Sequence, residues 1–274
     1  MITELQNNEF LKCINMVDLT GHMEVIAVIE RINPGRIFVD DTSSPTSGLI
    51  WLGNNDGFFF IGDEKNTRFN SEINDFVDSV ILPEAKSQGL DAFEAIGNHP
   101  AWNKTIEEVF SLRGLERWNQ KVYKLLPGDY RSTSNPEVNA IYSTVMITKE
   151  LYEDSSIKNP GFLHKKINEC WRSPEEFFQS GIGHAVLCDN EIVTLCLSGL
   201  VADNMHCIGI ETLEEHRGRK LAQKAAHSFA KECLQMGGVP YWDCMADNKP
   251  SVAIAESLGF SNVFNYSGYY FIFD

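Results

Sequence analysis

The chain has 274 residues, of which 43% are hydrophobic and 22% charged. This composition suits one or two buried cores and excludes a wholly disordered chain. Lys and Arg number 23 against 38 Asp and Glu, which gives a formal net charge of −15. A chain this acidic is not expected to bind nucleic acid through a general phosphate-binding surface. It can attract cationic small molecules, although a negative charge can equally serve only to keep a protein in solution.

Compartment and metal content are indicated by what the sequence lacks. No stretch approaches the ~20 apolar residues of a membrane span, and the N-terminus lacks the basic and apolar regions of a signal peptide. The seven cysteines form no Cys-x-x-Cys pair, which favours buried thiols in a reducing compartment. The histidines are scattered, so no metal site is predicted. We therefore expect a soluble, cytoplasmic protein without a membrane partner; its oligomeric state does not follow from the sequence.

The N-terminal half alternates strand and helix signals. Strands are predicted over 35–40, 47–52 and 57–62, the last two joined by a turn at 54–56, and over 91–96. A helix is predicted to open near Asn70, and Pro83 should end or kink it. A second helix is predicted from about Ala101 to Phe110.

A segment rich in Pro, Gly and Ser at 127–137 is typical of a linker or a long loop, so we predict two domains, 1–130 and 131–274. The elements predicted after this segment are, in chain order, a strand at 141–146, helices at 149–156 and from Ser173, strands at 183–188, 191–200 and 206–213, a helix at 220–236, a strand at 241–245, a helix at 250–258 and a final strand pair within 262–273. This order predicts an α/β (α+β) fold with a mixed, mostly antiparallel sheet flanked by helices.

The segment most informative about chemistry is the turn Arg217-Gly-Arg-Lys-Leu-Ala222, which joins the predicted strand 206–213 to the following helix. Such a turn directs backbone N–H groups and the positive end of a helix at one point, as pyrophosphate-binding sites do. About thirty residues later come Asn248, a short helix and a Gly259-Phe260 stop.

Together these two segments resemble the GCN5-related N-acetyltransferase (GNAT) family. The resemblance implies acetyl-CoA as co-substrate, no metal, and direct attack by the amine of a small molecule or peptide. It also implies a cofactor site made by the following residues: Thr212, Leu213, Arg217, Gly218, Arg219, Lys220, Leu221, Ala222 and Asn248. The backbone N–H groups near Thr212 and Leu213 would hold the acyl carbonyl and its oxyanion.

Two carboxylates are candidates for the catalytic base: Asp243, on the strand where the family often carries an acidic residue, and Glu211 at the end of the preceding strand. Each can equally be a solvated charge at a strand end. The chain departs from the family pattern twice: Lys220 stands at the central glycine of the loop, and Ala255 stands where a tyrosine often protonates the leaving thiolate. Other groups could serve as the acid, and none stands out: Tyr266, Tyr269, Tyr270, His206 and Cys244. We expect His216 to be a solvent-exposed loop residue.

The N-terminal half contains Asn33-Pro-Gly-Arg-Ile-Phe-Val-Asp-Asp41 and Ser47-Gly-Leu-Ile-Trp51. With these segments it is similar to the leader domain of a bacterial GNAT subgroup that includes a zwittermicin-resistance enzyme. An offset of about 150 residues aligns 59–62 with 207–210 and Asn98 with Asn248. This suggests either an ancient duplication or a chance similarity in the order of strands and helices. At the loop position this half carries Asp63 and Glu64, which would repel a pyrophosphate. We therefore expect a degenerate copy that binds no CoA and helps to wall the acceptor site.

These observations favour an acetyl-CoA-dependent N-acetyltransferase acting on a small or peptidic, cationic amine. An antibiotic, a polyamine and a protein N-terminus all remain open as acceptors, so a role in antibiotic resistance is one expectation. An alternative is an acyl-CoA-binding sensor or pseudoenzyme without turnover, favoured by Lys220 and Ala255. A nucleotide-phosphate site is disfavoured because no Gly-Lys-Ser/Thr follows the loop.

Overall fold

A computed structural model describes residues 1–53 and 57–273, and the chain divides into two compact units. Unit 1 comprises Met1–Gln120 and Asn265–Asp274, and unit 2 comprises Lys121–Phe264. The predicted division lies ten residues later, after residue 130, and the prediction assigns the C-terminal end of the chain to the second domain. The end belongs to unit 1 because the last part of β12 (Ser261–Ile272) pairs with β5 (Ala92–Gly97) of that unit.

Unit 1 is built on the strands β1 to β5, with the end of β12 beside β5. Its further elements are η1 (Asn7–Met16), α1 (Met23–Ile29), β1 (Thr3–Glu4), β2 (Arg36–Val39), β3 (Ser47–Trp51), β4 (Phe58–Gly62), α2 (Thr67–Phe76), η2 (Val77–Ile81), α3 (Leu82–Ser87), α4 (Trp102–Val109) and the start of β6 (Glu116–Lys124). Neighbouring strands are antiparallel except β4 and β5, which are parallel. The side chains of α2, α3 and α4 pack with strand aromatics such as Phe58, Phe60 and Phe93 in one buried cluster.

The helical run over 67–87 passes through Pro83 instead of ending there. The five residues before α3, Val77–Ile81, form a π-helical turn, and Pro83 lies in the first turn of α3. A proline lacks an N–H, so it is tolerated where the local pattern of intrahelical bonds changes. The apolar face of the run explains why it continues: Ile73, Val77 and Ile81 are all fully buried in the core of unit 1.

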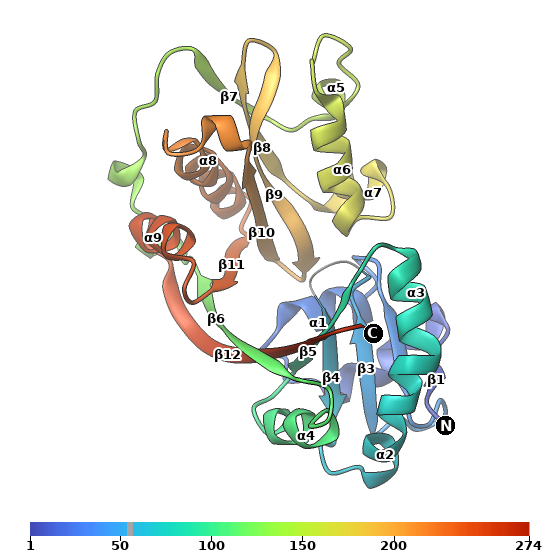
Figure 1. The fold of residues 1–274 in the computed structure, drawn as a ribbon. Coiled ribbons are helices and arrows are strands. Elements are labelled where there is room, and N and C mark those ends of the chain that lie inside the picture. The colour runs from blue at the N-terminus through green and yellow to red at the C-terminus, as the bar shows by residue number, and fades with distance from the viewer. Residues whose placement is uncertain (54–56, 274) are drawn as a thin grey trace. The chain divides into compact units, whose positions relative to one another are not determined.

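Unit 2 has the strand order β11-β10-β9-β8-β7. Its elements are β7 (Tyr142–Met146), α5 (Lys149–Tyr152), α6 (Pro160–Cys170), α7 (Pro174–Ser180), β8 (Gly183–Cys188), β9 (Glu191–Ala202), β10 (Met205–Thr212), η5 (Glu214–His216), α8 (Leu221–Gln235), β11 (Val239–Met245) and α9 (Lys249–Leu258), with the short turns η3 (Pro127–Asp129) and η4 (Ser132–Ser134) before β7. Helix α8 lies on one side of the strands and α6 on the other (Figure 1). The apolar stripe predicted for α8 is buried, with Ala225, Phe229 and Cys233 inaccessible to solvent.

The two units share one order of elements: three antiparallel strands, a helix, and a strand parallel to the third (Figure 1). In unit 1 these are β2, β3, β4 and β5, and in unit 2 they are β8, β9, β10 and β11. The predicted mixed, mostly antiparallel sheet with flanking helices is thereby confirmed. The duplication itself stays a prediction.

Of the two predicted alternatives for 127–137, a linker or a long loop, the structure shows a loop bound to unit 2: the Tyr130 hydroxyl lies 3.2 Å from His227 Nδ1 on α8, and the Arg131 N–H donates to the Leu258 carbonyl. The prediction of a strand pair within 262–273 is wrong: these residues form one strand, in which Gly268 makes room for the Trp118 ring, 2.1 Å from where a Cβ would stand. The predicted turn at 54–56 lies outside the described residues.

Candidate functional site

Among the residues that the structure describes, the first backbone donors of α8, at the turn after β10, have no partner. The first bond of α8 is donated by the Lys224 N–H to the Lys220 carbonyl, so the N–H groups of residues 221–223 have no acceptor within the helix. No side chain caps this helix end. Gly218 has φ +75° and is exposed, which keeps the approach to these donors open. Free N–H groups at the positive end of a helix form a site for an anion.

Lys220 is the residue immediately before α8, and its backbone is left-handed with φ +61° and ψ +18°. This conformation costs a residue with a Cβ about 1 kcal/mol, whereas glycine adopts it freely. The structure therefore gives a physical reason why the resemblance led us to expect glycine at this position. The side chain of Lys220 is exposed.

Replacing Lys220 by Gly is expected to raise the free energy of unfolding by about 0.5–1 kcal/mol, because the left-handed strain is relieved. Urea unfolding followed by circular dichroism measures this change. The matched control is Lys231→Gly in the exposed interior of α8, which should lower stability by about 1 kcal/mol. A Lys220→Gly variant as unstable as the control would contradict a strained Lys220.

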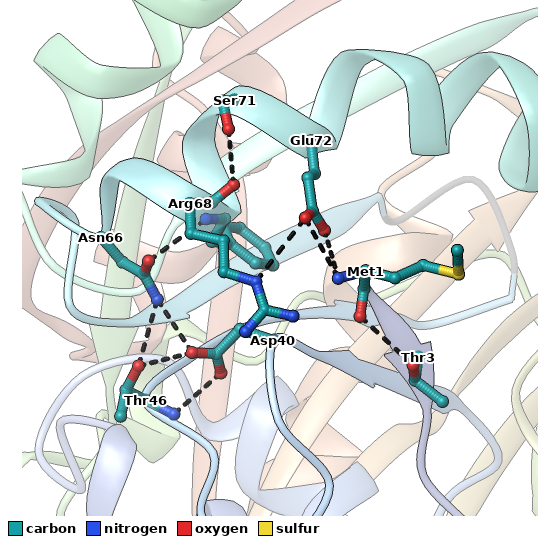
Figure 2. A network of polar contacts seen from close by, with 9 residues as sticks. Met1, Thr3, Asp40, Thr46, Asn66, Arg68, Ser71 and Glu72 are labelled. Carbon is teal, nitrogen blue, oxygen red and sulfur yellow. Dashed lines mark hydrogen bonds and ion pairs between the residues drawn. The ribbon is translucent and has the colours of Figure 1, made fainter.

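The corresponding loop of unit 1 has a side-chain cap on its helix and internal acceptors for several of its N–H groups. The Asp63 N–H donates to the Thr46 carbonyl at 2.9 Å, and the Asn66 side chain caps α2 by accepting from the Phe69 N–H at 3.1 Å. Figure 2 shows the Asn66 amide bonded in turn to the Asp40 carboxylate. Burial opposes ionisation of Asp40, but hydrogen bonds from Thr46 hold its pKa below the usual value, so the group is an anion. The start of α2 is therefore capped by a side chain and lies beside a carboxylate.

The N–H groups of Thr212 and Leu213, predicted to bind the oxyanion, point in different directions at the end of β10. The Leu213 N–H donates to the Val193 carbonyl of β9 at 2.9 Å and is not free to bind an oxyanion. Donors alternate between the two edges of an antiparallel strand, so the Thr212 N–H points away from β9, towards β11. Pairing of β10 with β11 is confined, within the described residues, to 205–207 and 239–241. The Thr212 N–H therefore lies where the two strands are no longer bonded.

The two candidate bases have different surroundings. Asp243 is half-buried on β11, and its neighbours Trp242 and Cys244 pack into the core of unit 2. Strand alternation therefore places Asp243 on the opposite face of β11. Glu211 is exposed, and its carboxylate lies 3.1 Å from the ammonium group of Lys166 on α6. The sequence did not indicate this ion pair, because helix α6 was not predicted.

The remaining predicted residues lie at the start of α8 and on or beside α9. The Asn248 side-chain oxygen accepts from the Ser251 N–H at 3.2 Å and caps α9, which supports the role of setting the turn. Its amide nitrogen has no acceptor among the described residues. Ala255 is fully buried, so α9 offers no hydroxyl at that position. Leu221 is buried too, whereas Ala222 is half-buried at the start of α8.

The side chains considered as catalytic acids are mostly engaged elsewhere. Tyr269 and Tyr270 belong to unit 1, where their hydroxyls donate to Glu107 and Glu116. Burial raises the pKa of Tyr269 to about 12. His206 lies 3.0 Å from the Ser198 hydroxyl in the interior of unit 2.

Two further acid candidates complete the set. Tyr266 stacks edge-on against His22 in unit 1, and burial raises the pKa of the Cys244 thiol. The sequence interpretation of His216 as a solvent-exposed residue is wrong: it is half-buried, and its Nδ1 lies 3.1 Å from the Tyr142 hydroxyl.

Among residues 1–53 and 57–273, no three His, Cys, Asp or Glu side chains gather in a way that could hold a metal ion. Within the same ranges, no helix is both long and apolar enough to cross a membrane.

Comparison with known proteins defines the class. The fold resembles that of a GCN5-related N-acetyltransferase-like protein from Streptococcus suis 89/1591, with a TM-score of 0.64, 22% identity and coverage of 86% of this chain and 88% of that one. It also resembles a tandem GNAT protein from the clavulanic acid biosynthesis pathway, with a TM-score of 0.60, 12% identity and coverage of 99% and 98%. The fold is therefore that of the GNAT acetyltransferases.

Sequence comparison shows the family. The model of the GNAT acetyltransferase family matches residues 14–269, so the chain belongs to this family. It is 28% identical over 246 residues to the N-acetyltransferase YdfB of Bacillus subtilis (strain 168), a match that covers 90% of this chain and 89% of that protein. The expected likeness to a zwittermicin-resistance enzyme stays a prediction.

Proposed function

We propose that this GNAT protein transfers the acetyl group of acetyl-CoA to the amine of a small or peptidic, cationic substrate. The observation that carries the proposal is the exposed start of α8, where residues 221–223 have N–H groups without intrahelical acceptors. Arg217, Arg219 and Lys220 add positive charge beside these donors. The diphosphate of the coenzyme is an anion of the kind that such a helix start binds.

Only unit 2 is proposed to bind the coenzyme. In unit 1 the equivalent helix is capped by Asn66, and the Asp40 carboxylate is bonded to that cap (Figure 2). A phosphate there would displace a satisfied cap and meet a negative charge. We therefore expect one bound CoA per chain, and unit 1 as the degenerate copy predicted from the sequence.

Acyl transfer needs a base for the amine, a donor for the oxyanion and a proton for the leaving thiolate. The amine nitrogen attacks the thioester carbonyl carbon of acetyl-CoA, a C–N bond forms, and the C–S bond breaks. Asp243 takes the proton that the attacking amine must lose, and the Thr212 N–H donates to the oxyanion. The departing thiolate takes its proton from water, since the buried Ala255 leaves α9 without a hydroxyl at that position.

Asp243 is the better base of the two candidates. Glu211 is held by the Lys166 ammonium at 3.1 Å, and it would have to give up this ion pair in order to accept a proton. Asp243 is half-buried on the face of β11 opposite the packed core of unit 2.

The cationic acceptor is inferred from the distribution of charge. Unit 1 carries nine Lys and Arg against twenty Asp and Glu, a net charge of −11, whereas unit 2 carries fourteen against eighteen, a net charge of −4. The negative field is therefore strongest around unit 1. A field of this sign raises the local concentration of cationic amines and repels anionic ones.

Thiol release from acetyl-CoA across a panel of cationic, neutral and anionic amines tests the function, with CoA binding measured separately by calorimetry. We expect turnover on at least one cationic amine, one CoA bound per chain, and a KM for the amine that rises between low and high salt. Tight CoA binding without turnover on any amine would support the alternative, a sensor or pseudoenzyme, which Ala255 favours. A KM insensitive to salt would refute the electrostatic part alone.

A further inference from the structure

Three side chains from segments far apart in the sequence meet at the turn between β10 and α8. The Tyr142 hydroxyl, at the start of β7, accepts from the Arg219 Nη1 at 2.5 Å and lies 3.1 Å from His216 Nδ1. The Tyr142 and His216 rings meet edge to face with centroids 5.8 Å apart. Tyr142 is only 8% exposed, so its hydroxyl is a fixed point on the body of unit 2.

This arrangement orients the Arg219 guanidinium. The Nη1 end is held by Tyr142, and Nη1 also lies 3.3 Å from His216 Nδ1. The opposite edge, formed by Nε and Nη2, donates to nothing among the described residues. Two parallel N–H donors on such an edge match the two oxygens of a phosphate. Arg219 therefore presents its pairing edge to solvent while its other end is anchored.

Arg217 is held differently. Its Nε donates to the Thr212 carbonyl at 3.2 Å, so the same edge of this guanidinium is already in use. Of the two arginines in the loop, Arg219 alone has this edge free.

The histidine completes the anchor. Both the Arg219 Nη1 and the Tyr142 hydroxyl lie within hydrogen-bond distance of His216 Nδ1, and a guanidinium N–H can only donate. With Nδ1 as the acceptor, the hydroxyl accepts from Arg219 and donates to His216 at the same time. The hydrogen bonds thus run in one direction, from the guanidinium through the hydroxyl to the imidazole.

We propose that Tyr142 is a positioning residue that, through Arg219, prepares the cofactor site for the diphosphate of the coenzyme. The inference rests on the proposed function. Its physical basis is preorganisation: a long, exposed arginine loses conformational freedom when it binds, and an arginine anchored in advance loses less. Arg219 contacts the diphosphate, and Tyr142 acts only through Arg219.

Calorimetry with Tyr142→Phe tests the proposal, since this variant lacks only the hydroxyl. We expect its Kd for CoA to be roughly tenfold higher than that of the wild type, as for the loss of a hydrogen bond to a charged group. Arg219→Gln should weaken binding further, and adding Tyr142→Phe to it should change nothing more. The matched control is Tyr130→Phe, which also removes a hydroxyl bonded to a histidine but touches no arginine; its Kd should equal that of the wild type.

Truncated ligands show which part of the coenzyme Arg219 holds. Tyr142→Phe should weaken 3′-dephospho-CoA as much as CoA, and should leave pantetheine, which has no diphosphate, unaffected. Unchanged CoA binding in Tyr142→Phe, additive effects in the double variant, or a loss confined to ligands with the 3′-phosphate would each overturn the proposal. A wild-type chain that binds no CoA would overturn the proposed function as well, so the two failures are distinguishable.

Discussion

Asp243→Asn is expected to lower kcat by about 10²- to 10⁴-fold, while the Kd for CoA stays within about twofold of the wild type. Removal of a positioned general base has an effect of this size, and the amide keeps the shape of the carboxylate but cannot accept the proton of the amine. Steady-state thiol release and calorimetry measure the two quantities. The fall of kcat/KM at low pH, which reports protonation of the catalytic base in the free enzyme, should also disappear.

Two control variants make this result specific to Asp243. Glu211→Gln removes the other candidate base and its ion pair with Lys166, and should change kcat by less than about threefold. Asp247→Asn removes an exposed carboxylate shortly after β11 and should have no effect. If Glu211→Gln abolished turnover and Asp243→Asn did not, the roles proposed for the two carboxylates would be reversed.

Gly218→Glu is expected to weaken CoA binding by about 100-fold or more. At ~5 Å, each contact between like charges near a protein surface costs about 1–3 kcal/mol, and a diphosphate carries two such charges. A Cβ added at Gly218 would meet no atom within 4 Å, so the expected effect is electrostatic, apart from the modest strain of a left-handed backbone. Calorimetry with CoA measures the loss.

Gly237→Glu is the matched control for this variant. Gly237 follows the other end of α8, has φ +81°, and likewise has no atom within 4 Å of an added Cβ. The control therefore carries the same charge and a similar backbone strain, but away from the proposed site. It should bind CoA like the wild type. Equal losses in both variants would mean that destabilisation, and not the charge at the start of α8, reduces binding.

Local patterns in the sequence were enough to predict most elements and the site loop. The paired apolar residues of α8 and the loop from Arg217 to Ala222 are properties of consecutive residues, so they are readable without a fold. Lys220 and Ala255 were recognised as departures only through the resemblance of these segments to the family pattern. Elements with weak local signals were missed: β6, which alternates little, and α6, whose Lys166 pairs with Glu211.

The tertiary structure alone decided which distant groups meet. The Tyr142 hydroxyl reaches Arg219 across 77 residues, and the end of β12 pairs with β5 across more than 160. No periodicity encodes such pairings, because they depend on how the elements pack. The left-handed backbone of Lys220 likewise follows from how the loop enters α8. The residue types of the proposed cofactor site are therefore properties of the sequence, whereas the orientation of their side chains and donors depends on packing.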